Sequence, residues 1–161
     1  MTLEELSAIE AIKQVKARYC HHIDLKEWDE YAGLFTVDAR LNTDRAVSTR
    51  GEDPVPQPEI RGRAAIRKFM PELLDSADTV HQVHMPIIEL TSPTSAKVIW
   101  AMEDIVRMSG FHLEGRGHYR EEYVVDDDGE WRIASLHLTR TWLNIVEGSP
   151  AGPEGLFDDE T

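Results

Sequence analysis

Cysteine is nearly absent from this sequence, and its scarcity excludes one class of protein. The chain of 161 residues holds a single cysteine, Cys20. One thiol forms no disulfide within the chain, so the protein is not one of the small secreted domains that disulfides hold together. With 41% hydrophobic residues, a chain of this length buries a core without such help.

Long apolar runs are missing too. No stretch of the sequence approaches the roughly 20 apolar residues that span a bilayer. The N-terminal segment "MTLEELSAIEAIKQ" is charged along its length and lacks the apolar core of a secretory signal. We therefore expect a soluble, cytoplasmic protein without a membrane partner.

Basic residues are few, with 17 against 30 acidic ones and a formal net charge of −13. A surface of this sign repels phosphate groups, which excludes nucleic-acid binding through a basic face. Five acids and no base lie in the tail "EGSPAGPEGLFDDET", residues 147–161. Its composition is typical of a flexible terminus, so we predict one domain over residues 1–146.

Metal-binding motifs such as H-E-x-x-H and C-x-x-C are absent. Two histidine pairs remain, His21 with His22 in "YCHHID" and His81 with His84 in "HQVHM". Neighbouring residues of a helix point about 100° apart, so the first pair does not easily face one ion. We predict no metal and no cofactor, and we interpret four residues as a packed thiol and surface or helix-end imidazoles: Cys20, His21, His22 and His81.

Apolar residues recur at helical spacing in the first half of the chain. They predict three helices, at residues 3–23, 26–35 and 63–77, and a short strand at 36–43. The stretch 44–60 holds three prolines and a glycine, which indicates a loop. A loop of this length is either a lid over a site or a tolerated surface insertion.

From residue 80 the apolar period changes to two. It predicts four strands, at 82–90, 95–108, 111–125 and 130–146, joined by hairpin turns. Helices followed by an antiparallel meander indicate an α+β fold, with the helices packed on one face of a curved sheet. The open face of such a sheet needs a cover, so we expect a homodimer or a homotrimer.

Two charged residues interrupt the rows of apolar side chains on the inner faces of these strands. Asp104 is the only charge on its face of the 95–108 strand. In the last strand, Arg140 shares a face with Leu136, Leu138 and Trp142. A buried charge without a partner costs several kcal/mol, so each needs pairing or hydration. Asp104 and Arg140 form either a structural pair or part of a polar centre in an apolar pocket.

Three further polar residues fit such a centre. His84 is in phase with Ile88 and Leu90 of the first predicted strand, and Tyr19 and Asp24 lie near the end of the first helix. A lone histidine in phase is also typical of a satisfied core residue. Five apolar or aromatic residues are candidates for a substrate-binding lining, and each also fits plain core: Phe35, Met85, Trp100, Met102 and Trp142.

The stretches "AIKQVKARYCHHIDLKEWDEYAGLFTVDAR", "RGRAAIRKF" and "GHYREEYVVDDDGEWRIASLHLTR" resemble the SnoaL-like domains of the nuclear transport factor 2-like (NTF2-like) superfamily. The resemblance covers nearly all of the chain except the 44–60 loop and the tail. It implies a cone-shaped α+β barrel, in which helices and a strongly bent sheet enclose a deep apolar pocket. The family includes scytalone dehydratase, dehydrochlorinases and bile-acid 7α-dehydratase.

The resemblance also implies site residues. The family's catalytic tyrosine and aspartate lie five apart, as Tyr19 and Asp24 do, and its histidine, second aspartate and arginine map to His84, Asp104 and Arg140. It implies a cofactor-free lyase or isomerase in which His84 is the general base and Asp24 orients it. Tyr19 would donate to a substrate oxygen. Asp104 is either a protonated donor or the ionised partner of Arg140.

The expected substrate is a small cyclic or polycyclic apolar molecule that carries a hydroxyl and a carbonyl group. Two alternatives stay open. One is a non-catalytic small-molecule-binding protein, and the other is an interaction domain that resembles the small subunit of ring-hydroxylating dioxygenases.

Overall fold

The computed structural model describes residues 1–148, so all but the first two residues of the predicted tail lie outside the described part. The first helix, α1 (Leu3–Leu25), begins with a capping box in which Thr2 and Glu5 bond each other's backbone N–H groups. It ends where Lys26 adopts the left-handed conformation, with φ of 62°. Asp24 therefore lies in its last turn.

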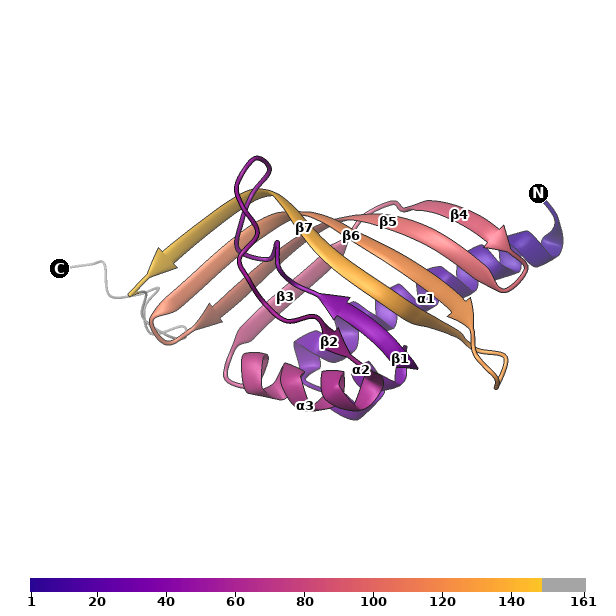
Figure 1. Ribbon diagram of the computed structural model, residues 1–161, viewed down its shortest axis with the longest axis horizontal. Helices are drawn as coiled ribbons and strands as arrows, with labels where there is room; N and C mark the ends of the chain where they lie inside the picture. Colours follow the sequence, from indigo (N-terminus) through magenta and orange to yellow (C-terminus); the bar gives the residue numbers. More distant parts are fainter. Residues whose placement is uncertain (149–161) are drawn as a thin grey trace.

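Two shorter helices, α2 (Trp28–Gly33) and α3 (Arg63–Leu74), complete the helical layer. Figure 1 shows the three helices on the same side of the sheet. None of the described helices has the length and apolar character that a membrane crossing requires.

The sheet has seven strands. They are β1 (Phe35–Asn42), β2 (Ile60–Arg61), β3 (Asp78–Val83), β4 (Ile87–Ser92), β5 (Ser95–Met108), β6 (Phe111–Val125) and β7 (Trp131–Glu147). Their order is β2-β1-β7-β6-β5-β3, and β4 also pairs with β5. β1 and β7 are parallel, and the other pairs are antiparallel. This arrangement confirms the predicted α+β class.

The predicted strand 82–90 is in fact two strands with an irregularity between them. Val83 lies opposite Met102, whereas Ile87 lies opposite Ile99, so the β3–β4 edge carries one more residue than β5 at this point. An extra residue moves every later side chain to the other face. Ile88 and Leu90 face inward on β4, but on β3 the inward residue is His81, which is 8% exposed.

A second irregularity lies in β7. Arg140 is opposite Gly117, but Trp142 is opposite Arg116, so Thr141 is an extra residue. The predicted common face of Arg140 and Trp142 is therefore wrong. Arg140 is buried, whereas Trp142 is exposed on the outer face, where the Arg116 guanidinium lies 4.8 Å from its ring centroid.

Two glycines of β6 make room on the inner face. A Cβ on Gly115 would stand 2.7 Å from Asp104 Oδ1 and would also overlap the Arg140 guanidinium. A Cβ on Gly117 would overlap the backbone oxygen of Thr139. The motif "GRG" thus lets β6 lie directly beneath Arg140 and close to β7.

The close approach at Gly117 can be tested with one methyl group. Gly117→Ala should lower the free energy of unfolding by about 2–3 kcal/mol, because the new Cβ meets backbone rather than a side chain that can move. Gly33→Ala is the matched control, since nothing lies within 4 Å of its Cβ position. It should be neutral or stabilising by up to about 1 kcal/mol in urea unfolding. Equal stability of the two variants would contradict the close approach.

Candidate functional site

A cavity of about 210 Å³ lies between the helices, the inner face of the sheet and the segment that joins β1 to β2 (residues 43–59, called the connecting segment below). Its wall is mostly apolar, with contributions from Ile23, Met70, Leu74, Leu113, Leu136 and Leu138. Of the connecting segment, Thr43, Ala46, Val47 and Gln57 reach the cavity wall. The predicted 44–60 loop therefore covers the cavity rather than forming an insertion remote from it.

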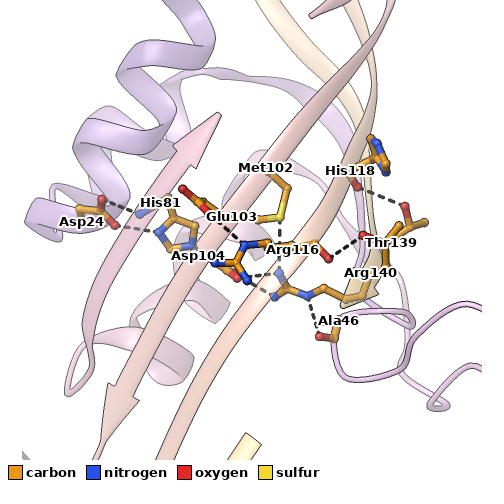
Figure 2. A network of polar contacts seen from close by, with 11 residues as sticks. Asp24, Ala46, His81, Met102, Glu103, Asp104, Arg116, His118, Thr139 and Arg140 are labelled. Atoms are coloured by element: carbon orange, nitrogen blue, oxygen red, sulfur yellow. Dashed lines mark hydrogen bonds and ion pairs between the residues drawn. The ribbon is translucent and has the colours of Figure 1, made fainter. Parts of the chain in front are cut away.

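His81 of β3 is bonded to Asp24 of α1 and so links the sheet to the first helix. Its Nδ1 lies 2.7 Å from Asp24 Oδ1, and its backbone N–H donates to Asp24 Oδ2 at 2.9 Å. The side chain of Asp24 thus grips both the ring and the backbone of His81 (Figure 2). Asp24 does not itself line the cavity, whereas His81 does. The Nδ1 position is engaged, and Nε2 is left on the opposite side of the ring.

The carboxylate of Asp24 is kept ionised by its neighbours. Burial opposes its charge, but hydrogen bonds from the His81 side chain and backbone and from Thr79 outweigh this and hold the pKa of Asp24 below its ordinary value. Lys26 Nζ donates in turn to Thr79 Oγ1 at 2.8 Å. An ionised acceptor at Nδ1 keeps the ring proton there and leaves Nε2 without a proton when the imidazole is neutral.

A buried ion pair lies next to His81. Arg140 donates to both carboxylate oxygens of Asp104, over 2.6 and 2.9 Å, and the two residues are nearly inaccessible to solvent. The sequence left two possibilities for Asp104, a protonated donor or a partner of Arg140. The structure has Asp104 paired with Arg140. Asp104 is directly opposite His81 in the β3–β5 register, and its Oδ2 is 4.0 Å from His81 Nε2.

The Nε of Arg140 bonds the connecting segment. Its Nε donates to the backbone oxygen of Ala46 over 3.0 Å, as Figure 2 shows. His137 of β7 makes a second link, with Nε2 2.8 Å from Asp44 Oδ1. These contacts fix the cover of the cavity to the same strand that carries Arg140.

Tyrosines form the wall at the helix side. Tyr19, Tyr31 and Tyr119 come from α1, α2 and β6, and their rings pack with centroids 5.0 Å (Tyr19–Tyr31) and 5.7 Å (Tyr19–Tyr119) apart. Burial raises the pKa of Tyr19 and of Tyr119 well above the usual value for a phenol. Both hydroxyls therefore keep their protons at neutral pH and can donate hydrogen bonds.

Behind these rings lies a second buried ion pair, which the sequence analysis missed. Lys16 Nζ is 2.5 Å from Glu121 Oε1 and lies over the Tyr19 and Tyr119 rings, 3.7 and 3.6 Å from their centroids. Burial lowers the pKa of Lys16, although Glu121 opposes this shift. A signal was present, since Lys16 falls on the buried stripe of α1 and Glu121 is in phase with Tyr119 and Tyr123.

The structure corrects the histidine assignment. His84 lies on the irregular turn after β3, its side chain is 57% exposed, and its nearest acid is Glu103, 3.7 Å from Nε2. His81, expected to be a surface or helix-end imidazole, lies where His84 was predicted. The reason is the extra residue of the β3–β4 edge, which reverses the face on which the histidine lies.

None of the five predicted substrate-binding residues lines the cavity. Met85, beside the irregular turn, is 92% exposed, and Trp142 lies on the outer face. Phe35, Trp100 and Met102 are buried in the core but are not among the residues that line the cavity. Of the predicted polar set, Tyr19, Asp104 and Arg140 line the cavity, and Asp24 lies one contact behind it.

Comparison with known proteins places this chain in a family. The sequence model described as a SnoaL-like domain matches residues 4–137. The chain belongs to the SnoaL-like domain family. Among curated relatives of this SnoaL-like protein, a probable cyclase of Gibberella zeae is 26% identical over 143 residues, which cover 84% of this chain and 92% of the relative.

Solved structures share the fold. A "putative scytalone dehydratase" from Novosphingobium aromaticivorans superposes with a TM-score of 0.77 and 22% identity, with full coverage of both chains. The hexachlorocyclohexane dehydrochlorinase LinA-type3 from Novosphingobium barchaimii has a TM-score of 0.73 and 15% identity, over 94% of this chain and 98% of its own. The SnoaL-like domain thus shares the NTF2-like fold with these structures.

The ion pair behind the tyrosines can be tested by a double-mutant cycle. Lys16→Met should lower the free energy of unfolding by about 3–5 kcal/mol, because Glu121 is left buried without its counterion. Lys16→Met combined with Glu121→Gln should recover at least about 2 kcal/mol of this loss, since the amide oxygen can still accept from Tyr123.

Lys13→Met is the matched control. Lys13 forms a 3.8 Å pair with Glu10 on the exposed side of the same helix, and its loss should cost less than about 1 kcal/mol in urea unfolding. An equal loss in the Lys13 and Lys16 variants would show that the buried pair makes no special contribution.

Proposed function

We propose that this SnoaL-like domain is a cofactor-free lyase or isomerase in which His81 removes a proton from a carbon atom of a small cyclic apolar substrate. One observation carries the proposal. The Nδ1 of His81 is held by an ionised aspartate, while its Nε2 lies on the side of the ring that faces Asp104, and both His81 and Asp104 line an apolar cavity. A base, a residue that orients it and a dry cavity are what general base catalysis requires.

The first step uses Nε2 as the base. It takes the proton, the electron pair of the C–H bond forms a C=C bond to the carbonyl carbon, and the π pair of the carbonyl group moves to its oxygen, which gives an enolate. The positive charge that develops on the ring lies 2.7 Å from Asp24 Oδ1 and 4.0 Å from Asp104 Oδ2. Two carboxylates at these distances stabilise an imidazolium in a site of low polarity.

The second step returns the proton. In a dehydration the enolate re-forms the carbonyl group, the C=C pair shifts to join the α- and β-carbons, and the β-hydroxyl group leaves with the electrons of its C–O bond and takes the proton from Nε2, which gives water. In an isomerisation the same proton goes back to another carbon. Tyr19 and Tyr119, protonated because burial raises the pKa of each, are placed on the cavity wall to donate to a carbonyl or enolate oxygen.

Arg140 and Asp104 have a positioning role in this proposal. The guanidinium uses Nε, Nη1 and Nη2 on Ala46 and Asp104, so it fixes the carboxylate and the connecting segment rather than gripping a substrate. The relatives named as a dehydratase, a dehydrochlorinase and a cyclase support this class of chemistry at the level of the family.

The histidine assignment is tested with two variants. His81→Gln should lower kcat by about 10²–10⁴, the usual contribution of a general base. His84→Ala should stay within about twofold of the unchanged protein, because its side chain is exposed outside the cavity. The substrates are cyclic β-hydroxy ketones, whose dehydration gives a conjugated enone that is followed by its ultraviolet absorbance.

Deuterium incorporation at the α-carbon in D₂O, measured by NMR, reports proton abstraction even where no group leaves. Full activity of His81→Gln, or an equal loss in His84→Ala, would refute His81 as the base. Tight binding of these ketones to the unchanged protein, without turnover or exchange, would instead favour a non-catalytic binding protein.

A further inference from the structure

A second group of ligand atoms lies outside the cavity, where α1 ends. His21 and His22 belong to the last turn of the helix, and the left-handed Lys26 reverses the chain behind it. The backbone N–H of Glu27 then donates to the His22 oxygen at 2.9 Å. This turn brings the Glu27 carboxylate back over the two imidazoles, although Glu27 itself begins the next helix.

The three side chains converge. Glu27 Oε2 lies 2.6 Å from His22 Nδ1 and 3.8 Å from His21 Nε2. One ligand atom from each residue lies within 4.8 Å of the other two, and within residues 1–148 no other three histidine, cysteine or acidic residues meet this condition. The sequence analysis argued that His21 and His22 do not easily face one ion. It did not take into account that the Glu27 carboxylate lies close to both imidazoles or that the two rings can rotate.

We propose that His21, His22 and Glu27 bind a divalent transition-metal ion of the Zn²⁺ class. Two imidazole nitrogens and one carboxylate oxygen are the donors that this class prefers, and oxygen-seeking ions such as Mg²⁺ would not favour them. With bonds of 2.0–2.1 Å, tetrahedral zinc holds its ligand atoms about 3.4 Å apart. The present separations of 2.6 and 3.8 Å from Glu27 Oε2 lie on either side of that value, and the two imidazole nitrogens lie within 4.8 Å of each other, so binding requires a shift of the carboxylate and an adjustment of the rings.

The surroundings favour a cation. The C-terminal end of a helix carries a partial negative charge, and the chain as a whole has a net charge of −13. The nearest lysine in sequence, Lys26, directs its Nζ to Thr79, 2.8 Å away, and not to the histidines. His21 is exposed and Glu27 is half-exposed, so a bound ion would keep at least one coordination position for water.

The site has a structural effect in this proposal. A bound ion ties the end of α1 to the start of α2, two residues from the aspartate that holds His81. Metal binding should therefore raise the melting temperature of the chain, whether or not the cavity catalyses a reaction.

The test is titration of the metal-free full chain with ZnCl₂, by isothermal calorimetry. One ion should bind per chain, and His21→Ala and Glu27→Gln should each raise the Kd at least about tenfold, because even residues that only hydrogen-bond to a metal ligand contribute about 10–100-fold to metal affinity. Zn²⁺ should raise the melting temperature of the unchanged chain but not of these variants. His21 is exposed, so its replacement leaves the fold intact.

Two controls make the outcome decisive. His112→Ala removes the imidazole of an ordinary histidine–glutamate pair, in which Nε2 and Glu114 Oε1 are 3.2 Å apart, and should leave the Kd unchanged. His81→Gln should also bind Zn²⁺ normally. No Zn²⁺ binding by the unchanged chain, an unchanged Kd in His21→Ala, or a loss confined to His81→Gln would each overturn the proposal.

Discussion

The interaction on which the cavity depends is the buried pair of Asp104 and Arg140. Opposite charges in an apolar interior are tolerated only when each satisfies the other, and separating them costs several kcal/mol. β5, β7 and the connecting segment must therefore keep one relative placement, since Arg140 bonds Asp104 and Ala46 at once. β6 lies between β5 and β7, and Gly115 and Gly117 give it the space that this arrangement needs.

His81 takes its place from the same arrangement. The strand register sets it opposite Asp104, and the last turn of α1 supplies Asp24 on the other side of the ring. Because Asp24 also accepts the His81 backbone N–H, the ring and the strand are fixed together. The proposed base is thus positioned by three elements, α1, β3 and β5, which makes its geometry a property of the fold rather than of a loop.

Much of this was accessible from the sequence. Periodicity predicted β5 and β6 with their observed bounds and placed Asp104 and Arg140 on the inner face. The β5–β6 pairing has no register shift, and none separates Arg140 from Leu136 and Leu138, the residues that set its phase. His81 and Trp142 were misplaced because a single extra residue in a strand leaves no mark in composition yet reverses every later side chain. The Lys16–Glu121 pair was missed although each residue is in phase with buried neighbours, because the sequence does not show that two residues 105 positions apart meet.

The pairing of the Arg140 guanidinium with Asp104 has a consequence for what can enter the cavity. An anionic group moved from water into an apolar space loses its hydration and needs a counterion in return. Among the described residues, Arg140 is the only lysine or arginine that lines this cavity, and it is paired with Asp104. Lys16, behind the tyrosine rings, is paired with Glu121. Asp24 adds a negative charge at the far side of His81. The cavity therefore selects by charge as well as by shape. Uncharged molecules enter it at little electrostatic cost, whereas the transfer of a carboxylate or a phosphate from water is unfavourable.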